Sequence, residues 1–273
     1  MFFMAVGRRI LIGEAVLASA VLFILSASAW PLDSIQSTSS RPFEDINIRE
    51  HKGRFESVNQ KGGFRIENIY GSADLKATGS VKVQRVDGDL RVTTQIGDID
   101  VGEVKGRIIA STGSGNIRIE KAHKHVSLGT EFGEIIVESA ASVKIKNGLG
   151  GDVKLLDIQE SADVVTRGNI HLALNGKAFR SDLCSLASKE GDITLYLPEH
   201  TGADIEIRVP LSEDPKREAH FESDFAFTKF DQKCLANRIL ILTVQINGGG
   251  GKILLQIEKG NVYLRATKAG KKP

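Results

Sequence analysis

Aspartate follows glycine repeatedly in the middle of the chain, in a pattern that could bind calcium. These aspartates are Asp89, Asp98, Asp152 and Asp192. In calcium-binding β-rolls, carboxylates at glycine-rich turns stack around each ion. The equivalent positions in other copies of the pattern hold Arg107, Asn116, His125 and Ser142. Such a mixture supplies no regular set of calcium ligands, so we interpret the aspartates as solvated turn residues.

Asp98 and Asp100 are the best candidates for a catalytic pair, because residues two apart on a strand project to the same side. Two carboxylates at a suitable separation can cleave a glycosidic bond, and β-helical folds include polysaccharide-cleaving enzymes. However, the same stretch lacks an accompanying platform of Arg, His and aromatic residues. We predict no catalytic residue and keep polysaccharide cleavage as an alternative.

Histidine and cysteine offer little metal or redox chemistry. His123 and His125 would share one side of a strand, but two ligands without a third do not make a metal site. Cys184 and Cys234 lie outside any Cys-x-x-Cys motif. Two alternatives stay open for them, a single disulfide or two free buried thiols. We predict no metal and no cofactor.

A nine-residue repeat positions all of these side chains. Each unit begins with a glycine or another small residue, followed by a polar residue. An aliphatic residue, a residue of any type and a second aliphatic residue come next, and a turn of about four residues ends the unit. The clearest copies begin at Gly88, Gly97, Gly115, Gly133, Gly151 and Gly168, and a further copy begins at Gly191. Fifteen units start between residues 44 and 168, at steps of eight, nine or ten residues. Because the aliphatic residues are two apart, each unit is a half-buried strand.

The short turns exclude parallel crossovers within one sheet, which need a dozen or more residues. We therefore predict an all-β fold, a right-handed parallel β-solenoid with about two short strands per coil and an irregular C-terminal capping segment. The glycines would form tight corners. A third apolar residue would fill the corners from inside, at positions such as Ile69, Val86, Ile96, Val104 and Ile158.

The regular solenoid is expected over residues 44–175, and its continuation and cap over 176–265. Within the cap, the period fails at 210–237, which we expect to be an irregular excursion that contains four phenylalanines. Strands at 239–246, 253–257 and 260–264 would then close the stack. A basic tail follows at 266–273.

Some segments resemble those of a known family. The Gly-Asp-Ile-x-Val units, the Gly191–Pro198 segment, and the Asn247–Gly251 turn with the strand Gly260–Leu264 are similar to sequences of the bacterial DUF4097 family. The resemblance covers roughly Asp45 to Arg265 and implies a β-helical fold. Family members are described as putative adhesins and are usually exported or membrane-tethered. The family has no motif of catalytic residues to transfer.

The N-terminal residues resemble an export segment. Arg8 and Arg9 precede an apolar run that leads to Ala27-Ser28-Ala29. We predict a signal peptide or an N-terminal membrane anchor over residues 1–29, with Ala27 and Ala29 marking the cleavage site, and a linker over 30–43. The formal net charge is only +2, from 36 basic and 34 acidic residues, which disfavours nucleic acid as a partner.

The sequence therefore predicts a non-catalytic exported cell-envelope protein that presents a solenoid surface for adhesion or protein–protein contact. It would be periplasmic, on the cell surface or membrane-anchored, with the solenoid outside the cytoplasm. Its partner would be an envelope or surface protein or glycan, and the membrane would be contacted only through an uncleaved N-terminal segment. The alternatives are a membrane-anchored envelope-stress sensor and a polysaccharide-cleaving β-helix enzyme.

Overall fold

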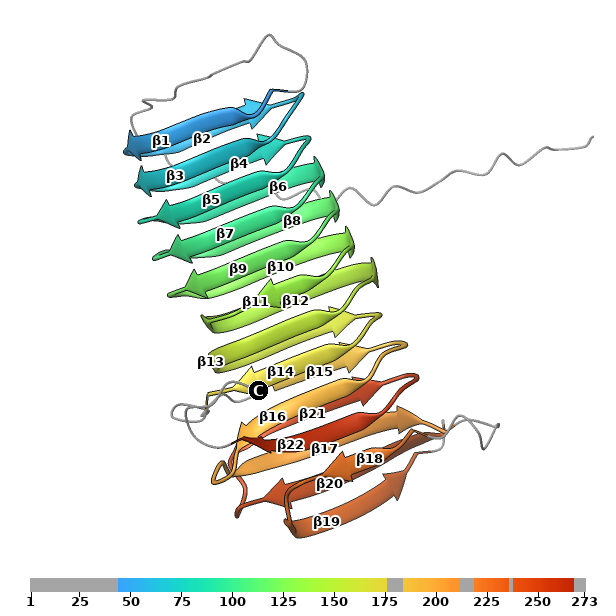
Figure 1. Ribbon diagram of the computed structural model, residues 1–273. Coiled ribbons are helices and arrows are strands. Elements are labelled where there is room, and N and C mark those ends of the chain that lie inside the picture. The colour runs from blue at the N-terminus through green and yellow to red at the C-terminus, as the bar shows by residue number, and fades with distance from the viewer. Residues whose placement is uncertain (1–43, 176–183, 212–218, 236–237, 268–273) are drawn as a thin grey trace, which may run out of the picture. The chain divides into compact units, whose positions relative to one another are not determined.

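A computed structural model describes residues 44–175, 184–211, 219–235 and 238–267 of the protein. The predicted export segment with Ala27 and Ala29, the predicted linker and nearly all of the basic tail lie outside the described residues. The described residues form a parallel β-solenoid of about 8 turns (Figure 1), with no helix among them. The prediction of an all-β solenoid is confirmed.

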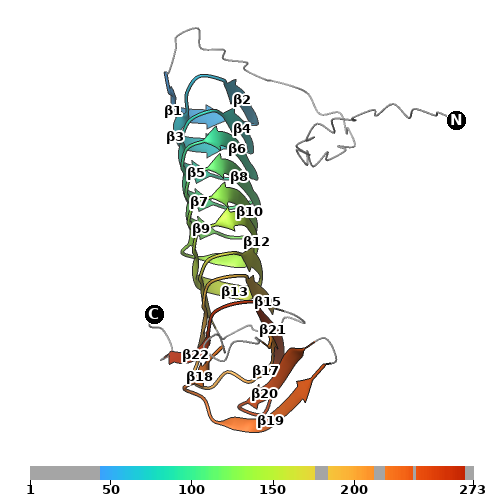
Figure 2. The same ribbon diagram turned by 90° about the vertical axis from the view of Figure 1, so that its right-hand side faces the viewer.

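The strands form two columns (Figure 2), which we call the first and the second face. In stacking order, the first face contains β1 (Ile46–Lys52), β3 (Phe64–Tyr70), β5 (Val81–Val86), β7 (Ile99–Val104), β9 (Ile117–Ala122), β11 (Ile135–Val137), the N-terminal part of β13 (Val153–Thr166), β14 (Ile170–Leu174), β16 (Ile193–Pro198), β22 (Val262–Thr267) and β18 (Phe221–Ser223).

The second face alternates with the first along the chain as far as β18, and β19, β20 and β21 then follow one another on the second face. In stacking order, it contains β2 (Phe55–Asn59), β4 (Ala73–Ala77), β6 (Leu90–Ile96), β8 (Ile108–Ser114), β10 (His125–Phe132), β12 (Ala140–Gly150), the C-terminal part of β13, β15 (Cys184–Ser188), β21 (Gly251–Ile257), β17 (Ala203–Pro210), β20 (Ile239–Ile246) and β19 (Phe227–Cys234).

Each coil lies in register on the one before it. Ile99 of β7 pairs with Ile117 of β9, which pairs with Ile135 of β11. Equivalent residues of these neighbouring coils are 18 positions apart, as Asp98 and Asn116 illustrate. The nine-residue unit is therefore half a coil. The inward side chains form one continuous aliphatic core.

The two inner corners of the coil differ in chemistry. At the end of the first-face strands, the inward residue is apolar, and a column of such residues runs along the solenoid: Ile69, Val86, Val104, Ala122, Ala140, Ile158 and Leu174. At the end of the second-face strands, the buried residue is usually polar. We call this second set the polar column: Asn59, Thr94, Thr112, Thr130, Asn147, Thr166 and Ser188.

Ile96 is therefore not a corner plug, and this part of the prediction is wrong. Its side chain is 67% exposed, whereas Thr94 is buried in the corner. The reason is that glycine carbonyls converge at this corner and need hydrogen-bond donors. Thr94, Thr112 and Thr166 donate through Oγ1 to the carbonyls of Gly79, Gly97 and Gly151, at 2.8, 3.0 and 2.9 Å.

Glycine is required at these corners because successive turns touch. A Cβ atom on Gly115 would overlap the carbonyl oxygen of Gly97, and one on Gly133 would overlap that of Gly115. Gly97, Gly115, Gly133 and Gly151 also have positive φ angles of 110–150°, which disfavour other residues. The predicted repeat glycines Gly88, Gly168 and Gly191 lack a positive φ, but a Cβ atom on them would also lie too close to the backbone of the preceding coil, at 2.7, 2.5 and 2.3 Å.

The last coils do not follow the order of the chain. β21 lies between β15 and β17, and β22 lies between β16 and β18. The segments 253–257 and 260–264 therefore insert into the stack rather than close it. β17, β18, β20 and β19 form the end, with β20 antiparallel to both β17 and β19. The described part of the predicted excursion at 210–237 is also more regular than expected, because it contains β18 and β19.

The polar column generates a stability prediction. Thr112→Val should lower the free energy of unfolding by about 1–3 kcal/mol, because the Gly97 carbonyl loses a buried donor. Thr93→Val, at an exposed position on β6, is the matched control and should change it by less than about 0.5 kcal/mol. Urea denaturation of both variants measures the difference, and equal losses would contradict this role of the column.

Candidate functional site

The repeated aspartates hold neighbouring coils together. The carboxylate Oδ1 of Asp98 accepts a hydrogen bond from the backbone N–H of Asn116 at 2.7 Å. Asn116 Oδ1 then accepts from the N–H of Glu134 at 2.8 Å. Asp152 accepts from the N–H of Asn169 at 2.9 Å. The interpretation of the aspartates as solvated turn residues is therefore incomplete, because Asp98 and Asp152 bind the backbone of the next coil.

The same column continues through the rearranged end of the solenoid. Asn169 Oδ1 accepts from the N–H of Asp192, Asp192 accepts from that of Asn261, and Asn261 accepts from that of His220, at 2.8, 2.7 and 3.0 Å. At this position of the coil, the side-chain oxygen of Asp or Asn therefore accepts a hydrogen bond from a backbone N–H of the adjacent turn. The presence of Asn within the same column agrees with a hydrogen-bonding role, which needs an acceptor oxygen but no charge.

Asp98 and Asp100 have separate partners. Asp98 binds the backbone of the following coil, whereas Asp100 on β7 forms an ion pair with Lys82 on β5, with 3.0 Å between Oδ2 and Nζ. Both carboxylates therefore have structural contacts that a catalytic pair would have to give up.

His123 and His125 diverge, so the prediction that they share one strand side is wrong. His123 lies in the turn before β10, and its Nε2 is 2.8 Å from Glu103 Oε1 in the preceding coil. His125 begins β10, and its Nδ1 is 2.9 Å from Ser142 Oγ in the following coil. Within the part of the chain that the structure describes, three or more potential metal-binding side chains do not gather anywhere.

The two cysteines are free thiols, which corrects both alternatives raised by the sequence. Cys184 is buried on β15 and Cys234 is exposed on β19. Burial raises the pKa of the Cys184 thiol to about 12, and its Sγ lies 3.3 Å from the carbonyl oxygen of Ala162. A thiol with so high a pKa is a poor nucleophile.

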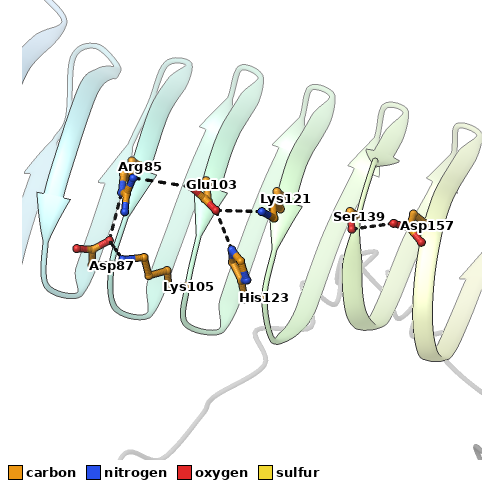
Figure 3. Close-up of polar contacts among 8 residues, drawn as sticks. All are labelled: Arg85, Asp87, Glu103, Lys105, Lys121, His123, Ser139 and Asp157. Atoms are coloured by element: carbon orange, nitrogen blue, oxygen red, sulfur yellow. Dashed lines mark hydrogen bonds and ion pairs between the residues drawn. The ribbon is translucent and has the colours of Figure 1, made fainter. Parts of the chain in front are cut away.

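The outward side of the first face has a network of ion pairs (Figure 3). In β5, β7 and β9, Arg85, Glu103 and Lys121 occupy equivalent positions, and Glu103 lies 4.0 Å from Arg85 and 3.3 Å from Lys121. In the adjacent turns, Asp87 lies 2.9 Å from Lys105. Hydrogen bonds from His123 and Lys121 lower the pKa of Glu103, and one from Lys105 lowers that of Asp87.

The ion-pair network was not predicted from the sequence, although the sequence contains a pattern that indicates it. Charges of opposite sign alternate one coil apart along Arg85, Glu103 and Lys121. The alternation becomes visible once the coil, and not the nine-residue unit, is taken as the period. These charges form ion pairs with one another and are exposed to water. The first face is therefore well suited to face solvent and not a binding partner.

From β6 to β15, the outward side of the second face carries fewer charged residues than the first face. Thr93, Ser111 and Gly129 lie side by side on β6, β8 and β10. Ile109 on β8 and Val165 on β13 are 46% and 41% exposed. Among the described strand residues from β6 to β15 on this face, Lys144 and Asp163 form the only ion pair, at 3.4 Å.

Comparisons with protein-family models, with curated proteins and with solved structures found no match for the chain. The resemblance to the DUF4097 family therefore stays a prediction. A search of the described residues found no helix that has both the length and the apolar character needed to cross a membrane.

The aspartate contacts predict a specific pH dependence. A hydrogen bond from the backbone of Arg107, together with its guanidinium, lowers the pKa of Asp89 below the ordinary value of 3.8. The ionised carboxylate therefore stabilises the fold above pH 3.8, and this contribution is lost as the pH falls through the lower folded-state pKa.

In Asp89→Asn, an oxygen acceptor remains but the titrating charge is absent. The wild-type chain should therefore be more stable than the variant at neutral pH, and the difference should shrink as the pH falls below 3.8. Urea denaturation at a series of pH values measures the difference. A difference that is constant down to the acid limit would show that the Asp89 charge is not linked to folding.

Proposed function

We propose that this is a non-catalytic, exported cell-envelope protein that uses its solenoid as a rigid surface for adhesion or protein–protein contact. The observation that carries the proposal is the difference between the two outer faces. First-face charges such as Arg85, Glu103 and Lys121 form ion pairs with one another, whereas the second face carries fewer charges between β6 and β15 and presents the exposed aliphatic residues Ile109 and Val165.

The second face is the better contact surface, because desolvating it costs less than desolvating ionised groups. Its backbone is held in place by parallel pairing from β2 to β15. A preorganised surface loses little conformational entropy when a partner binds. The aliphatic core fills the space between the faces, which directs binding to the outside.

The predicted export segment and the resemblance to a known family support the same proposal. Residues 1–29 have the layout of a secretory signal or membrane anchor, and the repeat and closing segments resemble DUF4097 proteins, which are described as putative adhesins. Cell fractionation combined with mass spectrometry of the mature N-terminus tests this part. A full-length chain confined to the cytoplasm would contradict it.

Two matched substitutions test the choice of face. Ile109 on β8 and Ile136 on β11 both point outward, one on each face, and each pairs with an arginine of the preceding coil, Arg91 or Arg118. Ile109→Glu and Ile136→Glu therefore place the same new charge beside an arginine of the preceding coil, while the neighbour in the following coil is Ser127 for Ile109 and Lys154 for Ile136.

The measurement is retention of the tagged full chain on intact envelopes and recovery of its cross-linked partners. Ile109→Glu should reduce retention by about tenfold, because a charge would be buried at the contact, and Ile136→Glu should leave it unchanged. Equal retention of all three proteins, or loss with Ile136→Glu alone, would contradict the proposed face.

A further inference from the structure

The final strand of the second face, β19, has one unpaired edge. β19 is antiparallel to β20, and no strand among the described residues pairs with its other side. All eight of its residues, Phe227–Cys234, are exposed. An edge strand of this length presents a row of backbone N–H and C=O groups that can accept another strand.

Aromatic rings lead from the solenoid to this edge. Phe221 of β18 stacks on Phe227 with 5.7 Å between ring centroids, and Phe227 stacks on Phe230 at 6.2 Å. Phe221 packs against the core, whereas Phe227 and Phe230 are 36% and 53% exposed. The row therefore ends on an exposed ring at the edge of the sheet. Of the four phenylalanines in this segment, Phe221 and Phe225 pack against the core, while Phe227 and Phe230 stay exposed.

The charges on the opposite side of β19 also lack partners within the strand pair. Lys229 lies opposite Gln245 and Asp231 lies opposite Thr243 on β20. Neither Lys229 nor Asp231 forms an ion pair with another described residue, in contrast to the partnered charges of the first face. Among the described residues, the carboxylate of Asp231 accepts a hydrogen bond from the neighbouring backbone N–H of Gln232, at 3.0 Å.

We infer that β19 is a self-association edge, at which two copies of this chain pair through antiparallel β19 strands centred on Phe230. In this register, Phe230 lies opposite its equivalent in the second copy, and each Lys229 lies opposite the Asp231 of the other. The aromatic rows of the two copies join at the symmetry axis. Moving the centre to Lys229 or Asp231 places identical charges opposite each other, which is unfavourable.

A second copy is the favoured occupant because the strand is complementary to itself. A two-fold axis brings identical patches together, and the Phe230-centred register forms one aromatic pair and two opposite-charge pairs. The opposing interpretation is that Lys229 and Lys233 protect the edge from any strand. The two interpretations predict different oligomeric states. The inference does not depend on the proposed adhesive function.

Charge exchange tests the pairing without removing aromatic packing. Two differently tagged copies of the full chain are co-expressed and purified together in a mild detergent. Lys229→Asp and Asp231→Lys should each weaken co-purification by about tenfold, because two attractive cross-strand pairs become repulsive. The double variant Lys229→Asp/Asp231→Lys should restore it. Single variants that match the wild type would overturn the inference, as would a double variant that stays dissociated.

A cysteine at the proposed axis tests the register. In a Cys234→Ser background, Phe230→Cys should form a disulfide-linked dimer on mild oxidation, since the two Cβ atoms would be neighbours. Gln84→Cys, at an exposed position of the first face, is the control and should form no disulfide-linked dimer under the same conditions. Absence of the Phe230→Cys dimer in chains that retain a β-rich far-ultraviolet spectrum, or cross-linking equal to the control, would overturn the Phe230-centred pairing.

Discussion

Parallel pairing of each strand with the equivalent strand of the next coil is the interaction on which the rest of the structure depends. Once residues such as Ile99, Ile117 and Ile135 are in register, every other position of the repeat also forms a column. A side chain therefore meets its own counterparts in the coils before and after it. The chemistry of each column is a property of the whole solenoid.

The columns satisfy different requirements of the same coil. Aliphatic residues fill the interior, while the polar column supplies donors to the carbonyls of the glycine corner, as Thr112 does to Gly97. Asp and Asn side chains accept from the backbone of the next turn, as Asp98 does from Asn116. Glycine permits the corners to touch. These requirements explain why aspartate and asparagine recur after glycine in the sequence.

Much of the fold could be predicted because it depends on local periodicity. Aliphatic residues two apart and short turns define both the half-coil and the solenoid. Features that depend on contacts between coils were less accessible. Ile96 and Thr94 are both plausible corner residues in sequence, and only the converging carbonyls select Thr94. The insertion of β21 and β22 into the stack joins segments about 70 residues apart, such as Asp192 and Asn261, and no local pattern encodes that order.

The properties of the outer surface could not be predicted from the sequence, and here the structure adds most. The repeat alone makes the two faces look equivalent. The structure separates a first face with a network of ion pairs from a second face with fewer charges, and it places a strand with one unpaired edge and exposed phenylalanines at one end. Interactions outside the chain are therefore best sought on the second face and at β19.

The register of neighbouring coils can be measured directly by disulfide formation in a variant without Cys184 and Cys234. Thr93 and Ser111 lie opposite each other on β6 and β8, so Thr93→Cys/Ser111→Cys should oxidise readily. In Thr93→Cys/Gly113→Cys, the strand spacing and a shift of two residues separate the Cα atoms by about 8 Å, too far for a bond. A disulfide in the first pair and none in the second would support the account. The reverse result, or equal oxidation of both pairs, would contradict it.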